Sequence, residues 1–380
     1  MKTVSLQIEG WRGINHSYAL VNQFQILALL KRGDVEIFHR DLPFYRPQWN
    51  PTINGCGLQP EDRGKIDAIP PPTGRCDATY RIAFPYRLYG GESGQIFSFG
   101  TAEYQWVEDN FIYGGEERDR KYENERVSVV TPSNWSKVGF LRKGFREETV
   151  HVVPHGVDPR YFHPLSVEER GEARRKFGIP KDAFAFLNAG AMTGNKGIEL
   201  LVAAFAQVRR RRHFAVLLLK DQCNLYNIAA YDRLVTMRQQ WPGIVDESVL
   251  SGIGTIGKNL SLADLRLLYG ACDAYVSPYR GEGFNLTPLE AAACGTPIAV
   301  TSGGATDDYA QPAFSVKIAS RLQNSGDRHL LEPDFESLVA CMEALIDRRA
   351  AEIDMHAGVA WILENFTWDR AVDKLMGLFL

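Results

Sequence analysis

The fold is decided by the stretch Glu282-Gly283-Phe284-Asn285-Leu286-Thr287-Pro288-Leu289-Glu290, in which a glycine-bearing loop leads into the start of a helix. Thr287 is a suitable N-cap, Pro288 suits the first helical position, and Glu290 lies three residues after the cap. We therefore expect a helix to begin near Thr287. The loop from Gly283 to Asn285 is expected to point its open backbone amides outward.

These amides form an anion-binding site, because unpaired N–H groups and the helix dipole both favour negative charge. Glu282 is expected at the mouth of the site and Glu290 one helical turn inside it. A carboxylate at each end of such a site suits a diphosphate flanked by two polyols, which describes a nucleotide sugar. The alternative is structural: Thr287 and Glu290 also fit a capping box, with Glu290 bound only to its own helix and Glu282 an ordinary surface residue.

Length and composition limit the class of protein. A chain of 380 residues suits two domains, and 45% hydrophobic with 23% charged residues is typical of a globular soluble protein. A net charge of -3 gives no electrostatic reason to expect a nucleic-acid partner. The N-terminus lacks the apolar core of a signal peptide, and no stretch approaches a membrane-spanning length. We therefore expect a cytoplasmic protein.

The six cysteines carry no metal-binding pattern. They are scattered without a C-x-x-C pair and without histidines at ligand spacing, so they are interpreted as reduced thiols and no zinc site is expected.

The chain alternates strand and helix signals, which is typical of parallel α/β sheets. In the first half we expect a glycine loop from Gly10 to Ser17, a long irregular excursion from Pro43 to Pro72, a helix at Tyr18 to Leu30, and strands at Thr3 to Ile8, Val35 to Phe38, Tyr80 to Phe84, Gln95 to Phe99, Arg126 to Val130 and Val150 to Val153. In the second half we expect helices at Ile198 to Arg211 and Leu262 to Tyr269, a helical tail from Phe335 to Leu380 with a break near Asn365, and strands at Phe184 to Asn188, Ala215 to Leu219, Ala274 to Val276 and Pro297 to Val300.

This order of elements predicts two Rossmann-like parallel-sheet domains that face each other across a cleft, with ligands at the carboxyl ends of the strands. The first domain is expected over residues 1–158 and the second over residues 159–365. The final helix, residues 366–380, is expected to pack back onto the first domain.

Several segments together resemble glycosyltransferase family 4. They are the junction Pro154 to Asp158 (P-x-G-x-D), the Lys-Gly turn Gly194 to Gly197, the Glu282 to Glu290 motif and its continuation Leu289 to Pro297. They cover the junction and the whole second half in the family's order, whereas the first half resembles the family only in layout and in its glycine loop. The resemblance implies a GT-B fold and retaining sugar transfer from a nucleotide diphosphate sugar without a metal.

The resemblance also implies roles for single residues. Glu290 would bind the ribose hydroxyls, Glu282 the hydroxyls of the donor sugar, and Lys196 the leaving phosphate, so Glu282 and Lys196 are the candidate catalytic residues. Apart from the resemblance, the glycine loop suggests that Gly13 lets the acceptor or the diphosphate approach the backbone closely, the alternative being that it only makes the turn. Gly257 is expected to end a strand whose backbone meets the nucleotide base. The candidate substrate-binding residues are Gly13, Gly257, Gly283, Phe284, Asn285, Leu286, Thr287 and Glu290.

Two positions depart from the family pattern. Ala191 stands where the family usually has an arginine, so Lys196 acts alone or is assisted by a cation such as Arg280. Gly100 stands where the family often has a histidine near the reacting sugar. The residues that could line the cleft in its place are Glu103, Arg87 and His16.

The substrates are predicted only by class. UDP-glucose is the default donor, and the acceptor is expected to be a glycan or a lipid-linked sugar in polysaccharide biosynthesis. The basic run from Arg209 to Arg212 is interpreted as a solvated helix end, which leaves peripheral contact with an anionic membrane open. Two alternatives to transfer remain: a GT-B epimerase that rearranges a nucleotide sugar, and a catalytically silent protein that only binds one.

Overall fold

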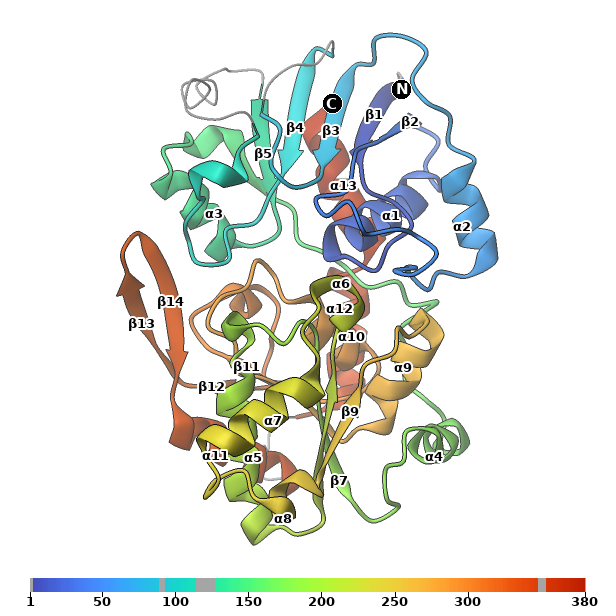
Figure 1. The fold of residues 1–380 in the computed structure, drawn as a ribbon. Helices are drawn as coiled ribbons and strands as arrows, with labels where there is room; N and C mark the ends of the chain where they lie inside the picture. The colour runs from blue at the N-terminus through green and yellow to red at the C-terminus, as the bar shows by residue number, and fades with distance from the viewer. Residues whose placement is uncertain (1–2, 89–92, 114–126, 348–352, 380) are drawn as a thin grey trace. The chain divides into compact units, whose positions relative to one another are not determined.

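The chain divides into two compact units. This computed structural model describes residues 3–88, 93–113, 127–347 and 353–379. Unit 1 consists of Met1–Asp158 and Phe366–Leu380, and unit 2 of Pro159–Asn365. The two units are described separately below (Figure 1).

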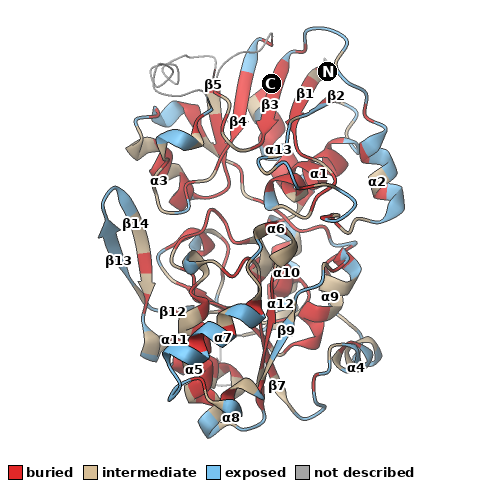
Figure 2. Ribbon diagram, viewed as in Figure 1, coloured by how far each residue is buried: buried red, intermediate tan, exposed pale blue. Residues whose placement is uncertain are grey.

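Unit 1 is built on a parallel sheet of six strands among its described residues, in the order β2-β1-β3-β4-β5-β6. The strands are β1 (Val4–Gly10), β2 (Val35–Asp41), β3 (Ala78–Ile82), β4 (Gln95–Phe99), β5 (Val127–Thr131) and β6 (Val150–Val152). The central strand β3 is buried along its whole length, as expected for a parallel sheet covered on both faces (Figure 2).

The helices of unit 1 include one from each end of the chain. They are α1 (Ser17–Leu29), α2 (Pro60–Asp67), α3 (Asn134–Arg142) and α13 (Trp368–Phe379), with short 3-10 turns η1 (Asp109–Phe111) and η4 (Glu147–Thr149). The C-terminal α13 lies beside α1 and the strands of unit 1 (Figure 1): Trp368 stacks on Phe24 at 5.5 Å, and Phe379 contacts Phe97 at 4.8 Å between ring centroids.

The expectation of an irregular excursion from Pro43 to Pro72 is wrong in part, because α2 lies within it. Only two residues of α2 are buried, Asp62 and Ile66, so it has no apolar periodicity to detect. It is supported instead by proline at its N-terminus and by an i,i+4 ion pair between Lys65 and Glu61.

Unit 2 contains a second parallel sheet of six strands among its described residues, in the order β12-β11-β10-β7-β8-β9. The strands are β7 (Phe184–Ala189), β8 (Ala215–Lys220), β9 (Ile253–Ile256), β10 (Ala274–Ser277), β11 (Ile298–Thr301) and β12 (Ser315–Ile318). This is the 3-2-1-4-5-6 strand order of dinucleotide-binding Rossmann folds, in which the order of the parallel strands reverses between β7 and β10. Ligands of such sheets bind at the carboxyl ends of the strands beside that reversal.

Helices cover both faces of this sheet. They are α4 (Val167–Lys176), α5 (Ile198–Arg211), α6 (Cys223–Tyr226), α7 (Ala230–Gln240), α8 (Glu247–Leu250), α9 (Leu262–Ala271), α10 (Leu286–Ala293), α11 (Phe335–Ile346) and α12 (Met355–Asn365), with 3-10 turns η5 (Gly194–Lys196) and η6 (Ala305–Asp308). A two-stranded antiparallel hairpin follows β12, formed by β13 (Ser320–Ser325) and β14 (Arg328–Pro333). The apolar faces of α5, α7 and α11 pack on β7, β8 and β10 and form the core of the unit.

The basic run at the end of α5 is an exposed helix end, as expected, with Arg210 and Arg211 exposed, and its arginines also contact neighbouring segments. Arg209 donates to the carbonyl of His213 at 2.7 Å and Arg210 to that of Gly243 at 2.8 Å. The other two arginines pair with carboxylates of unit 2, Arg211 with Glu343 and Arg212 with Asp347. All four guanidinium groups therefore hold neighbouring segments of unit 2. None of the helices in the described ranges is long and apolar enough to cross a membrane.

Candidate active site

The central element of the site is the loop between β10 and α10. The helix begins at Leu286, and its N-cap is Asn285 in the left-handed conformation with a φ of 68°. The expectation that Thr287 caps the helix is therefore wrong. Asn285 is fixed from both sides, since its side-chain amide donates to Ser277 Oγ at 3.0 Å and its carbonyl accepts from the Tyr309 hydroxyl at 2.8 Å. An asparagine tolerates this backbone conformation better than most residues do.

The first turn of α10 has open amides. No described residue accepts a hydrogen bond from the N–H groups of Leu286 and Thr287. The Thr287 hydroxyl bonds instead to the hydroxyl of Tyr275 at 2.7 Å, and Tyr275 bonds both backbone groups of Ala189 at the end of β7. The helix start is thereby fixed against two strands while its amides remain open, as required for an anion site.

Glu290 lies one turn inside α10 and is buried, with 8% of its surface exposed. Its carboxylate accepts a hydrogen bond from Tyr269 of α9 at 2.8 Å, so the capping-box interpretation is wrong. Burial raises the pKa of Glu290 to about 7 in spite of this bond, which lowers it. A buried carboxylate with one protein donor retains lone pairs for further donors, and the hydroxyls of a ligand can supply them.

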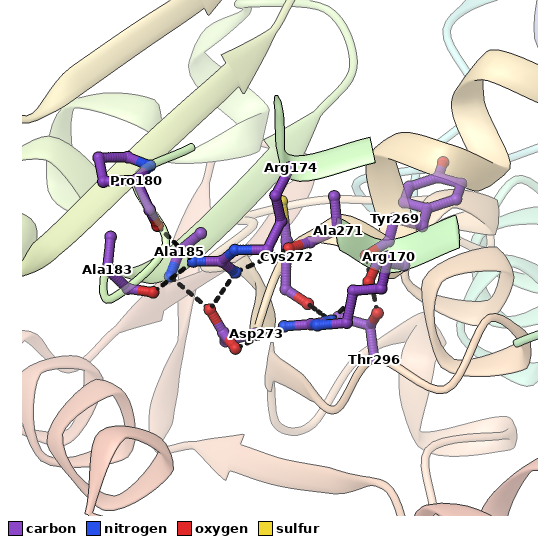
Figure 3. A network of polar contacts seen from close by, with 11 residues as sticks. Arg170, Arg174, Pro180, Ala183, Ala185, Tyr269, Ala271, Cys272, Asp273 and Thr296 are labelled. Carbon is purple, nitrogen blue, oxygen red and sulfur yellow. Dashed lines mark hydrogen bonds and ion pairs between the residues drawn. The ribbon is translucent and has the colours of Figure 1, made fainter. Parts of the chain in front are cut away.

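Tyr269 is held in place by a polar network at the end of α9 (Figure 3). Thr296 donates to its carbonyl at 2.8 Å, and Arg174 of α4 donates to the next carbonyl but one, Ala271, at 3.0 Å. Asp273 neutralises two guanidinium groups of α4, those of Arg170 at 2.7 Å and Arg174 at 3.1 Å. The two arginines donate to carbonyl groups that the C-terminus of α9 leaves without helical partners. These bonds fix the end of the helix that carries Tyr269, the hydrogen-bond donor to Glu290.

The loop after β7 meets the loop after β10. The backbone carbonyl of Asn195 accepts from the Arg280 amide at 2.7 Å, and its side chain donates to the Gly281 carbonyl at 3.1 Å. Gly197 has a φ of +63°, and a β-carbon there would lie 2.1 Å from the carbonyl oxygen of Pro278. Only glycine allows this approach, so the Lys-Gly turn is fixed against the motif loop.

Lys196 and Glu282 form an ion pair between these two loops. Glu282 is 5% exposed, whereas the Lys196 side chain is 23% exposed. The sequence predicted both residues for the site but not their pairing. Strands β7 and β10 are neighbours in the sheet, at the point where the strand order reverses. The loops that follow them therefore bring a cation and a carboxylate together.

Arg280 does not stand free to assist Lys196. Its guanidinium pairs with Glu199 of α5 and, at 3.0 Å, with Glu332 of β14, and it donates to the Gly194 carbonyl at 3.1 Å. It braces the two loops against the hairpin. Ala191 is buried and supplies no charge.

The sequence analysis missed a second lysine at the same edge of the sheet. Lys220 ends β8, in register with Ala189, and its backbone carbonyl accepts from the Gly190 amide at 2.9 Å. The side chain is buried and its ammonium donates to the carbonyl of Asp221. Burial lowers the pKa of Lys220, although Asp221 opposes this. The signal for it was a lysine that ends an otherwise apolar strand.

Gly257 follows β9, two strands from β7 and at the same edge of the sheet. Its carbonyl accepts from the thiol of Cys223 at 3.3 Å, and a β-carbon would lie 3.6 Å from the Asp221 carboxylate. The residue is thus placed at a strand end as expected, while its contact with a base stays a prediction.

The remaining predicted positions belong to unit 1. Gly13 has a φ of +84° and its amide donates to the side chain of Gln23 at 3.0 Å. A β-carbon at Gly100 would lie 2.8 Å from the ring of Phe140, so packing excludes a larger side chain at the position where glycosyltransferase family 4 often has a histidine. His16 caps α1 by accepting from the Tyr18 amide at 3.2 Å, and burial lowers its pKa to about 4.

Two units, each with helices on a parallel six-stranded sheet, define the GT-B fold class. A glycosyltransferase from Rickettsia africae aligns with 100% of this chain and 98% of its own, with a TM-score of 0.68 and 15% identity. Alr3699/HepE of Anabaena in complex with UDP-glucose aligns over 99% of both chains, with a TM-score of 0.66 and 12% identity. These similarities confirm the predicted GT-B fold.

The match to a known family lies within unit 2. Residues 169–319 match the family described as Glycosyl transferases group 1. A D-inositol 3-phosphate glycosyltransferase of Catenulispora acidiphila is 29% identical over 248 residues, which are 62% of this chain and 52% of that protein. Mannosylfructose-phosphate synthase of Agrobacterium fabrum is 30% identical over 164 residues, which are 42% and 34% of the two chains. The chain spans about half the length of the first of these relatives.

Proposed function

We propose that the protein is a retaining, metal-independent glycosyltransferase that moves a hexose from a nucleotide diphosphate sugar to a glycan or lipid-linked sugar. The observation that carries this proposal is the buried carboxylate of Glu290, one turn behind the open amides of Leu286 and Thr287. Few ligands need an anion site and a polyol site at this spacing, and a nucleotide diphosphate does. The match of residues 169–319 to Glycosyl transferases group 1 supports the same class of activity.

Each residue then has a defined task. Glu290 accepts hydrogen bonds from the ribose hydroxyls, and the amides of α10 bind the diphosphate. Lys196 is shared between Glu282 and the diphosphate, so the negative charge that develops on the leaving group meets a cation already in place. Glu282 accepts from hydroxyls of the donor sugar and keeps the sugar oriented.

In the proposed reaction the bond between the anomeric carbon and the diphosphate oxygen breaks as the acceptor hydroxyl attacks the same face of the sugar. A new glycosidic bond forms to the acceptor oxygen, and the hydroxyl proton passes to the leaving phosphate. No protein nucleophile is needed, and charge stabilisation by donors held in position is the main contribution of the protein. UDP-glucose is the donor we propose first.

The first test is thermal denaturation with a panel of nucleotide sugars, with and without EDTA. A ligand at a hundredfold excess over its Kd stabilises the fold by about 2.7 kcal/mol. We expect UDP-glucose to raise the Tm of the wild type regardless of EDTA and to have a smaller effect on Glu290→Gln. The matched control is Glu247→Gln, a substitution in unit 2 at a side chain that is 80% exposed. If no nucleotide sugar raises the Tm, the proposal fails.

The products distinguish transfer from its two alternatives. Transfer releases UDP in an acceptor-dependent manner, whereas an epimerase converts one nucleotide sugar to another without an acceptor. A silent binder does neither, and the absence of a side chain at Gly100 and of a charge at Ala191 favours it as the second candidate. Chromatography of the nucleotide products with and without a mixture of acceptor glycans separates the three.

A further inference from the structure

Unit 1 contains a pocket that the proposed donor site does not use. Its volume is about 460 Å³, within the roughly 300–1,000 Å³ typical of ligand pockets. It lies at the carboxyl ends of two parallel strands, where α/β sheets bind ligands. Arg12 follows β1, Asp41 ends β2, and α2 contributes Arg63 and Asp67.

The polar wall of the pocket consists of two ion pairs that are held in position. Arg12 binds both carboxylate oxygens of Asp41, at 2.8 and 2.7 Å, and donates to the Ile66 carbonyl at 2.8 Å. Arg63 binds Asp67 at 2.6 Å. Although burial acts to raise it, the pKa of Asp41 is lowered by the hydrogen bond and charge of Arg12, so this carboxylate is ionised at neutral pH.

The balance of charge decides the class of ligand. The carboxylates of Asp41 and Asp67, whose side chains are 62% and 48% exposed, would repel an anion in this pocket. The guanidinium groups of the two arginines would repel a cation. An uncharged polyol satisfies both kinds of group, because its hydroxyls donate to the carboxylates and its oxygens accept from the guanidinium groups. Charge therefore selects a neutral, hydroxyl-rich ligand.

The opposite wall is apolar. It consists of Leu42, Pro43, Phe44 and Pro51. Trp11 fixes this wall from behind, since its indole N–H donates to the Pro43 carbonyl at 2.9 Å and its ring meets Phe44 edge-on at 6.2 Å. A sugar ring presents hydroxyls at its edge and C–H groups on its face, which matches a polar wall opposite an apolar one.

Gly13 acquires a specific role in this arrangement. A β-carbon there would lie 2.9 Å from Nη1 of Arg63 and 3.1 Å from Pro51, so a larger residue would displace both walls. Its positive φ and the bond from its amide to Gln23 keep the loop against Arg63.

We propose that this pocket binds an uncharged sugar unit of the acceptor. The assignment to the acceptor rests on the proposed function, whereas the binding of a neutral sugar by unit 1 does not depend on it. Arg63 and Asp67 are the residues that would contact this sugar from α2.

The test uses the full chain and a panel of neutral tetrasaccharides, namely malto-, cello-, manno- and galactotetraose, with tetragalacturonate as the anionic counterpart. Binding is followed by saturation-transfer NMR and by hydrogen exchange of residues 60–67 in the wild type, which requires no variant. We expect a neutral tetrasaccharide to bind at millimolar concentration and to slow exchange in α2. Binding should weaken at least about tenfold in Arg63→Gln and Asp67→Asn, the loss of one good hydrogen bond.

The matched control is Glu61→Gln, on the same helix but outside the pocket and 79% exposed at its side chain. It should bind the tetrasaccharide as the wild type does, and all three variants should retain the wild-type response to UDP-glucose. The proposal is overturned if tetragalacturonate binds more tightly, if no neutral tetrasaccharide binds, or if binding is insensitive to both pocket substitutions. Failure of every nucleotide sugar in the panel to bind the wild type would overturn the proposed function alone.

Discussion

Replacing Glu290 by glutamine should stabilise the fold at pH 8 while it weakens the binding of the donor. Burial raises the pKa of this carboxyl from 4.5 to about 7. Because the folded-state pKa lies above the unfolded one, the contribution of Glu290 to stability is greatest below pH 4.5 and is lost as the pH rises through about 7. The change in pKa corresponds to about 3 kcal/mol at pH 8. Glutamine has the same shape, carries no charge, and can still accept the hydrogen bond from Tyr269.

The assay is urea denaturation of the wild type and Glu290→Gln between about pH 5 and pH 8. We expect the difference in the free energy of unfolding to grow by about 2–3 kcal/mol in favour of the variant over this range. Hydrogen exchange of peptides from α9 and α10 assigns the effect to unit 2. Glu247→Gln, the exposed control, should show no such trend.

The affinity for UDP-glucose should change in the opposite direction. A hydrogen bond to a charged group contributes about 1 kcal/mol more than a neutral one, so Glu290→Gln should raise the Kd about fivefold at pH 8. A variant that is less stable than the wild type at pH 8, or a stability difference that is constant with pH, would refute the argument that the folded protein holds an ionised buried carboxylate.

Three further results are expected. The affinity of the wild type for UDP-glucose should increase as the pH rises through about 7, because Glu290 ionises there, whereas the affinity of Glu290→Gln should not change. Titration calorimetry measures both affinities, and parallel pH profiles for the two proteins would speak against the contact between Glu290 and the ribose. Gly197→Ala should lower the free energy of unfolding by about 2 kcal/mol or more, because its β-carbon would lie 2.1 Å from a backbone oxygen. The control Gly194→Ala, which has open space around it, should stay within about 1 kcal/mol of the wild type when both are measured by urea denaturation. Lys196→Met should destabilise the fold by about 3 kcal/mol, because it leaves the carboxylate of Glu282 buried and unpaired. Adding Glu282→Gln should restore the stability but not the turnover. Recovery of turnover in the double variant would exclude a role for the lysine in catalysis.

The sequence was sufficient to predict the elements whose burial is periodic. Helix α5 begins and ends at the predicted residues, Ile198 and Arg211, because its apolar face packs on the core. The units separate after Asp158 and again after Asn365, the positions at which the sequence analysis placed the domain boundaries. Helix α2 escaped detection because it buries only two residues, Asp62 and Ile66.

The site was predicted in outline and not in its internal contacts. Spacing could not decide whether Glu290 caps its own helix, because the deciding partner, Tyr269, lies 21 residues earlier on another helix. The start of α10 was misplaced because Asn285 adopts a left-handed backbone that no local pattern indicates. The pairing of Lys196 with Glu282 depends on the order of strands in the sheet, which only the folded structure supplies.

The place of α13 in unit 1 has a consequence for folding during synthesis. All residues of unit 2 are made before residues 366–380, so unit 2 can fold while unit 1 still lacks its last helix. Until that helix arrives, Phe24 and Phe97 have no partners in Trp368 and Phe379, and their apolar surface is open to chaperones or to other nascent chains. Unit 1 is therefore completed only after the whole of unit 2 has been synthesised.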